Sequence, residues 1–185
     1  MGNFYTNITL RAATQERVAQ AVAGRTCYVS RELDGHVIVA DERCDEQLTP
    51  ELTALAEQLS SELGVRAVAV MNHDDDVLWL QFFDRGSSLG DDYVSAPGYF
   101  SGEESPPTGG DSTAIAQAFG IPERGSEVER ILRADSAEYA FAFERHSELF
   151  RVLGLPDAAA GVGYAYIADG DLSGALSAED FLHIT

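Results

Sequence analysis

The chain has 185 residues, of which 45% are hydrophobic, and this proportion supports a buried core and excludes global disorder. The formal net charge of −19 would repel phosphate backbones and anionic lipids, so we expect neither nucleic acid nor a membrane as a partner. The first residues lack the basic and apolar regions of a signal peptide. Cys27 and Cys44 are therefore expected to be reduced thiols, and the expected compartment is the cytoplasm.

The first half of the chain predicts seven elements in the order βαββαββ. Asp34 and Gly35 form the expected turn of one hairpin, and residues 72–76 form that of another. Thr49 is the expected N-cap of the clearest helix. Phe4, Ile8 and Leu10 are expected on one face of the first strand. The expected strands are residues 4–10, 26–33, 36–42, 65–71 and 77–84, and the expected helices are residues 14–23 and 49–64.

This order of elements predicts an α+β fold with a ferredoxin-like antiparallel sheet, because helical crossovers place both helices on one face. The last strand is apolar on both faces, with Leu78, Leu80 and Phe82 on one and Trp79 and Phe83 on the other. We therefore expect the second face to be covered by the C-terminal region or by another subunit. Both a monomer and a homodimer stay open.

The remaining residues predict a mainly helical region. Residues 1–95 are expected to form the ferredoxin-like unit, residues 96–112 a loop or linker rich in Gly, Ser, Pro and acid, and residues 113–185 a helical region packed on the first unit as one globule. Helices are expected from Asp111 or Ser112 to Gly120, after a capping box of Ser126 with Glu129, and over residues 136–153, of which residues 139–143 alone could also form a strand. Residues 161–168 alternate as a strand would.

The segments MGNFYTN and NHDDDVLW resemble small, acidic bacterial proteins without a characterised activity, so this resemblance implies no function. The C-terminal segment DGDLSGALSAED resembles an EF-hand calcium loop. The resemblance implies oxygen ligands from Asp169, Asp171, Ser173, the carbonyl of Ala175, and Asp180. Ca²⁺ is the only cofactor that the sequence suggests.

Two features of this segment depart from the EF-hand pattern. Its twelfth position holds Asp180, whose side chain is shorter than the glutamate that grips calcium with both oxygens. The preceding residues look like a strand rather than an entering helix, and no second loop accompanies the first. The alternative is a polar turn followed by a short helix that Ser177 caps together with Asp180.

His73, Asp74, Asp75 and Asp76 form the most acidic short stretch. The same residues are good turn formers, and they are candidates for contact with a cation or a protein partner. Neither cysteine has the spacing of a zinc site, and no phosphate-binding, dinucleotide-binding or hydrolase motif is present.

Three functions are compatible with these patterns. The charge and the absence of a catalytic motif favour a non-enzymatic interaction protein, either an immunity-type protein or a regulatory partner of a basic protein. The first alternative is a calcium-binding protein that uses residues 169–180. The second is an enzyme with a pocket between the sheet and the C-terminal helices, whose acids would come from residues 72–76 and 41–46.

The calcium hypothesis predicts that millimolar CaCl₂ raises the melting temperature above its value in chelator, because a ligand that binds only the native state stabilises it. Differential scanning fluorimetry of the purified protein checks this, with MgCl₂ as the matched control. An unchanged melting temperature in millimolar calcium would end the hypothesis.

Overall fold

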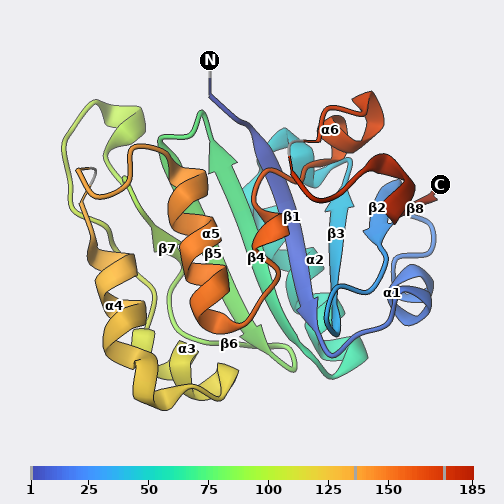
Figure 1. Cartoon of the computed structure of the whole chain (residues 1–185), viewed down its shortest axis with the longest axis horizontal. Helices are drawn as coiled ribbons and strands as arrows, with labels where there is room; N and C mark the ends of the chain where they lie inside the picture. The colour runs from blue at the N-terminus through green and yellow to red at the C-terminus, as the bar shows by residue number, and fades with distance from the viewer. Residues whose placement is uncertain (1, 136, 173) are drawn as a thin grey trace.

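The computed structural model describes residues 2–135, 137–172 and 174–185. Its centre is an eight-stranded sheet in the order β6-β5-β4-β1-β3-β2-β8, with β7 paired to β5. Every pairing is antiparallel (Figure 1). The strands are β1 (Tyr5–Arg11), β2 (Cys27–Ser30), β3 (His36–Asp41), β4 (Arg66–His73), β5 (Val77–Asp84), β6 (Ser87–Ser88), β7 (Tyr93–Val94) and β8 (Phe181–Ile184).

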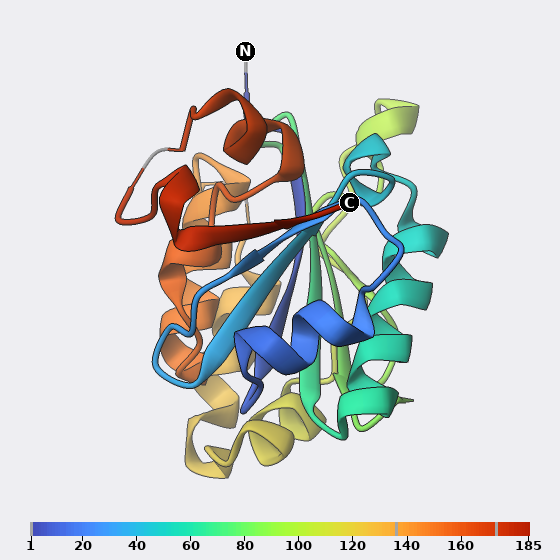
Figure 2. The same cartoon turned by 90° about the vertical axis from the view of Figure 1, so that its right-hand side faces the viewer.

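Helices cover both faces of this sheet, as Figure 2 shows from the side. Helices α1 and α2 lie on one face, and helices from the second half of the chain lie on the other. None of the helices in the described part of the chain is long and apolar enough to cross a bilayer. The helices are α1 (Gln15–Ala21), α2 (Thr49–Leu63), α3 (Ser112–Phe119), α4 (Gly125–Arg133), α5 (Ala142–Leu153) and α6 (Tyr164–Asp169).

Alternate residues of the central strands belong to two separate cores. Leu78, Leu80 and Phe82 of β5 pack with apolar residues of α3, α4 and α5. Trp79 and Phe83 pack instead with apolar residues of α1 and α2. The expectation that both faces of residues 77–84 are covered is thus confirmed, and the C-terminal half of the chain supplies the second cover.

The α+β class and both hairpins are confirmed. A simple ferredoxin-like topology is not, because the sheet is larger: β6, β7 and β8 extend it on both sides. Strand β8 was not expected from the sequence, and it carries the C-terminal region into the sheet beside β2. The expected position of Phe4 is wrong, since this residue precedes β1 and is 42% exposed.

Several helix ends differ from expectation. The hydroxyl of Thr14 caps α1, whereas Thr49, the expected N-cap of the next helix, lies inside α2, whose N-cap is Leu48. Ser126 lies inside α4 and forms no capping box. The helix expected over residues 136–153 begins only at Ala142. At its start, the carboxylate of Glu144 accepts a hydrogen bond from the backbone N–H of Phe141. Ser136 lies outside the described residues.

The strand expected over residues 161–168 is wrong. Residues 164–169 form α6, and Gly170 ends it in a left-handed conformation with φ of 68°. A carboxylate oxygen of Asp45 accepts a hydrogen bond from the N–H of Ala165 at 3.0 Å and so satisfies one of the free donors at the start of this helix. A residue 120 positions away thus overrides the local alternation.

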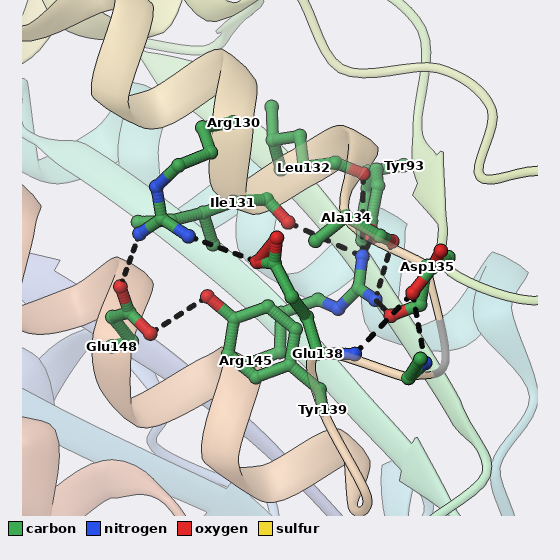
Figure 3. A network of polar contacts seen from close by, with 11 residues as sticks. Tyr93, Arg130, Ile131, Leu132, Ala134, Asp135, Glu138, Tyr139, Arg145 and Glu148 are labelled. Atoms are coloured by element: carbon green, nitrogen blue, oxygen red, sulfur yellow. Dashed lines mark hydrogen bonds and ion pairs between the residues drawn. The ribbon is translucent and has the colours of Figure 1, made fainter.

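A buried arginine joins α5 to the end of α4 (Figure 3). Arg145 is only 4% exposed, and its guanidinium donates a hydrogen bond to the hydroxyl of Tyr93 at 2.6 Å. It also donates to four backbone carbonyls in the last turn of α4 and just beyond, namely those of Ile131, Leu132, Ala134 and Asp135. These carbonyls lack partners within the helix, and the helix dipole favours a cation there. Arg145 therefore fixes α4 on the sheet.

We predict that Arg145→Lys lowers the free energy of unfolding by at least about 3 kcal/mol. The compact ammonium group of lysine cannot donate to all of these acceptors at once, so buried carbonyls would be left without donors. Arg151→Lys is the matched control, since Arg151 is an exposed residue of the same helix, and its effect should stay within about 0.5 kcal/mol. Urea unfolding measures both. Equal stabilities of the two variants would contradict the role of Arg145.

His146, the next residue of α5, is fully buried. Its Nδ1 lies 2.9 Å from the hydroxyl of Tyr5, and its ring meets that of Phe150 edge to face at 4.2 Å. Burial lowers the pKa of His146 to about 3, so the imidazole is neutral in the folded protein. The unfolded chain, whose histidines titrate near 6.5, binds this proton more readily than the folded protein does.

We therefore predict that stability falls as the pH drops from about 6.5 toward 3, with a slope from His146 that approaches about 1.4 kcal/mol per pH unit. His146→Gln should remove this part of the slope. His183→Gln, which changes an exposed histidine of β8, should keep it. Urea titrations at pH 7, 6 and 5 measure the three slopes, and identical slopes in wild type and His146→Gln would refute the assignment.

Candidate functional site

Three acidic segments that are distant in the sequence lie at the same end of the sheet. This acidic end comprises residues 41–47 at the end of β3, the β4–β5 turn at residues 74–76, and α6 with Gly170 and Asp171 (Figure 1). The Nε2 of Gln47 donates to the carbonyl of Asn72 at 2.8 Å and links the first two segments. The bond from Ala165 to Asp45 links the first and the third.

The aspartate triplet is the tip of the β4–β5 hairpin. Asp74 and Asp75 have φ values of 54° and 60°, and the N–H of Asp76 donates to the carbonyl of His73 at 3.0 Å. Two left-handed residues closed by such a bond form a type I′ turn, which aspartate tolerates better than most residues. The expectation of a turn at this place is confirmed.

The three aspartates differ sharply in their surroundings. Asp75 is 7% exposed, whereas Asp76 is exposed. The carboxylate of Asp75 accepts hydrogen bonds from the backbone and side-chain nitrogens of Asn3 at 3.0 and 2.7 Å, and from Nδ2 of Asn72 at 2.7 Å. Its carbonyl accepts a bond from the N–H of Ala142, the first residue of α5, at 2.6 Å. Asp75 is thus a structural residue that ties three segments together.

Four aromatic rings gather beside this turn, and we call Phe4, His73, Tyr99 and Phe100 the aromatic patch. The ring of His73 is central, with centroid distances of 4.9 Å to Phe4, 5.8 Å to Tyr99 and 5.1 Å to Phe100. Its Nδ1 lies 2.5 Å from Oε1 of Gln47. Phe100 is 73% exposed, so this patch presents apolar surface to solvent in the middle of the acidic end.

The charges of Asp74 and Asp76 reach this patch. Partial desolvation and, next, the negative charges of Asp76 and Asp74 raise the pKa of Tyr99. Asp74 also accepts a hydrogen bond from the N–H of Gly2 at 2.8 Å. The patch is therefore apolar in its rings and negatively charged at its edge.

The loop 41–47 is acidic, and two of its carboxylates accept hydrogen bonds from distant parts of the chain, Asp41 from Arg25 and Asp45 from Ala165. Arg25 donates to both oxygens of Asp41, at 2.6 and 3.0 Å. Burial acts to raise the pKa of Asp41, but the bonds from Arg25 outweigh it and hold that pKa below its usual range. Burial also raises the pKa of Cys27 to about 12, and that of Cys44 as well, so both thiols stay protonated.

Arginines mark the opposite end of the sheet. Arg11 of β1 lies directly across from Arg66 of β4, and Arg85 follows β5 at the same end. The Arg66 guanidinium lies 3.7 Å from the carboxylate of Asp84. Asp84 accompanies these arginines, and Arg25 lies with Asp41 at the acidic end. The field that favours a cation at the β4–β5 turn therefore comes from the three aspartates of the turn itself.

The structure also places the residues of the proposed calcium loop. Asp169 is the last residue of α6, and Asp171 and Ala175 are exposed, while Ser173 lies outside the described residues. Both oxygens of Asp180 are already bonded: one accepts from the N–H of Ser177 at 2.9 Å, the other from Arg31 at 2.6 Å. The expected cap of Ser177 with Asp180 is present. Calcium loading would require Asp180 to exchange these partners, and calcium binding stays a prediction.

Small hollows adjoin two of the sequence-predicted acidic stretches. One of about 100 Å³ lies beside Asp75 and Asp76, and one of about 190 Å³ lies beside Asp41 and Glu42. Asp75 and Asp41 are occupied by the bonds above, so neither is placed as a general base. Within residues 2–135, 137–172 and 174–185, no three acidic, histidine or cysteine side chains are arranged to hold a metal ion.

Sequence reasoning missed the aromatic part of the site. Tyr99 and Phe100 lie in the segment that was expected only to be a loop or linker, and both are exposed, whereas Tyr93 before it is fully buried. Two adjacent aromatic residues, Tyr99 and Phe100, in a segment rich in Gly, Ser and Pro were the sequence signal that could have indicated this patch. Comparisons with protein-family models, curated proteins and solved structures found no match to this chain.

Proposed function

We propose that this protein is a non-enzymatic interaction protein that binds a basic protein through its acidic end. The observation that carries this proposal is the exposed aromatic patch beside Asp74 and Asp76, at the end of the sheet opposite Arg11, Arg66 and Arg85. Aromatic anchors supply contact area in protein interfaces, and complementary charge steers association and selects the partner.

The rigidity of this surface supports the proposal. The turn is held by Asp75, and the loop that carries Tyr99 and Phe100 is held to β5 by a hydrogen bond from the N–H of Ser95 to the carbonyl of Leu78 at 2.9 Å. A surface that is already ordered loses little conformational entropy when a partner binds.

The finer fold assignment is also a proposal. We infer that β1, β2, β3 and β4 with α1 and α2 form a ferredoxin-like unit to which the other elements are added. Two observations support it: the spatial order β4-β1-β3-β2 and the shared face of α1 and α2.

We predict that immobilised wild-type protein retains a basic protein from lysate of the cells that express it at 50 mM NaCl and releases this protein at 500 mM. The double variant Asp74→Asn/Asp76→Asn should retain about fivefold less, because two exposed charged contacts of about 0.5 kcal/mol each are lost.

The matched control is Glu16→Gln/Glu62→Gln, which removes the same charge from exposed residues of α1 and α2. It should bind as the wild type does. Quantitative mass spectrometry of the eluates measures the three recoveries, and equal loss in both double variants would show that net charge alone, rather than the acidic end, causes retention.

A further inference from the structure

We propose that the aromatic patch binds the guanidinium group of an arginine from an extended basic segment of the partner, so that the patch distinguishes arginine from lysine. This inference rests on the proposed function and names the chemistry that the acidic end recognises.

The exposed rings supply the first part of such a site. Phe100 is 73% exposed, Phe4 42% and Tyr99 36%. Tyr99 and Phe100 meet edge to face, with centroids 5.2 Å apart and planes at 86°. Most of the Phe100 ring is therefore open to a planar group from outside. The faces of aromatic rings carry negative electrostatic potential and attract a cation within about 6 Å of the centroid.

Carboxylates beside the rings supply the second part. Asp74 directly follows His73, the central ring of the patch, and Asp76 is an exposed residue of the same turn. The negative charges of both carboxylates act, after desolvation, to raise the pKa of Tyr99. A guanidinium on the Phe100 ring would find a carboxylate at the edge of the same patch. An arginine can then stack and donate hydrogen bonds at once, which the compact and strongly hydrated ammonium of lysine does not do.

The chain uses the same pairing elsewhere. The guanidinium carbon of Arg145 lies 4.8 Å from the ring centroid of Tyr139, and that of Arg11 lies 5.8 Å from that of Phe119. These are the arginine–ring contacts in the part of the chain that the structure describes, and neither involves the aromatic patch. The aromatic patch thus presents tyrosine and phenylalanine rings, the same ring types that contact arginine inside this protein. It does so beside the acidic β4–β5 turn, where a cation from outside is favoured.

The loop that carries Tyr99 and Phe100 has a defined conformation of its own. The N–H groups of Ser101 and Glu103 both donate to the carbonyl of Gly98, at 3.0 and 3.1 Å. A Cβ atom built on Gly98 would lie only 2.0 Å from the carbonyl oxygen of Glu103, so this close turn requires glycine. Phe100 is consequently presented in a defined orientation before any partner arrives.

The test uses nona-arginine and nona-lysine, each with the same N-terminal fluorophore, titrated with full-length protein at 50 mM and 200 mM NaCl. Fluorescence anisotropy gives the two dissociation constants. We expect the wild type to bind nona-arginine at least about fivefold more tightly than nona-lysine, which corresponds to one exposed cation–π contact. In Phe100→Ser this ratio should fall to less than about twofold, while the affinity for nona-lysine changes little.

Phe141→Ser is the matched control, because Phe141 is a 49% exposed aromatic residue outside the aromatic patch. It should keep the wild-type ratio, and melting curves of all three proteins establish that they fold alike. A ratio that is the same in wild type and Phe100→Ser would overturn the inference, even if both peptides bind with strong salt dependence as the proposed function requires. Failure of both peptides to bind at 50 mM NaCl would instead count against the proposed function itself.

Discussion

The arrangement of the acidic end depends on the buried carboxylate of Asp75. A buried charge is costly unless donors surround it, and here two asparagines, Asn3 and Asn72, supply three hydrogen bonds. The carbonyl of the same residue accepts a bond from the first turn of α5. One residue thereby joins the segment before β1, the β4–β5 turn and the helix that covers the sheet. Asp74 and Asp76 flank Asp75 in the same turn, and Phe4 and His73 directly follow the two asparagines that bond its carboxylate.

The sheet explains why the charged groups are separated. Both of its faces are occupied by apolar cores, so the charged side chains of the sheet lie near the strand ends, while the polar residues buried within β1 are the uncharged Thr6, Asn7 and Thr9. Where a charge is nevertheless buried, it is heavily bonded, as Arg145 is by the carbonyls at the end of α4. At one end of the strands lie Arg66 and Arg85 together with Asp84, and at the other lie the aspartates of the β4–β5 turn. The interaction surface that we propose is therefore a consequence of a sheet covered on both sides.

Local patterns predicted those elements whose causes are local. The turn at Asp34 and Gly35, the helix over residues 49–64, and the two apolar faces of β5 all follow from neighbouring residues, and the structure has them. Helix α6 could not be predicted in this way, since its first turn is stabilised by Asp45 from a distant loop. Strand β8 was missed for a similar reason: four residues carry little periodic signal, and their pairing with β2 is a tertiary contact.

The candidate site was predicted in part. The sequence pointed to the aspartates of the turn, but the same residue type occurs three times in succession, and only tertiary contacts separate the structural Asp75 from the exposed Asp76. Phe4 and Phe100 lie 96 positions apart and meet through His73, which no sequence spacing reveals. Exposure, rather than residue type, distinguishes an aromatic anchor from a core residue such as Tyr93.

The division of roles within the triplet is tested most directly by comparing Asp75→Asn with Asp76→Asn, since both replace one carboxylate by an amide. For each variant, urea unfolding gives stability and anisotropy gives the affinity for nona-arginine. The account predicts that Asp75→Asn lowers the free energy of unfolding by about 1–3 kcal/mol, because an amide cannot accept all three hydrogen bonds. Asp76→Asn should change the free energy of unfolding by less than about 0.5 kcal/mol and should weaken peptide binding. Equal destabilisation by the two variants, or unchanged peptide binding by Asp76→Asn, would contradict it.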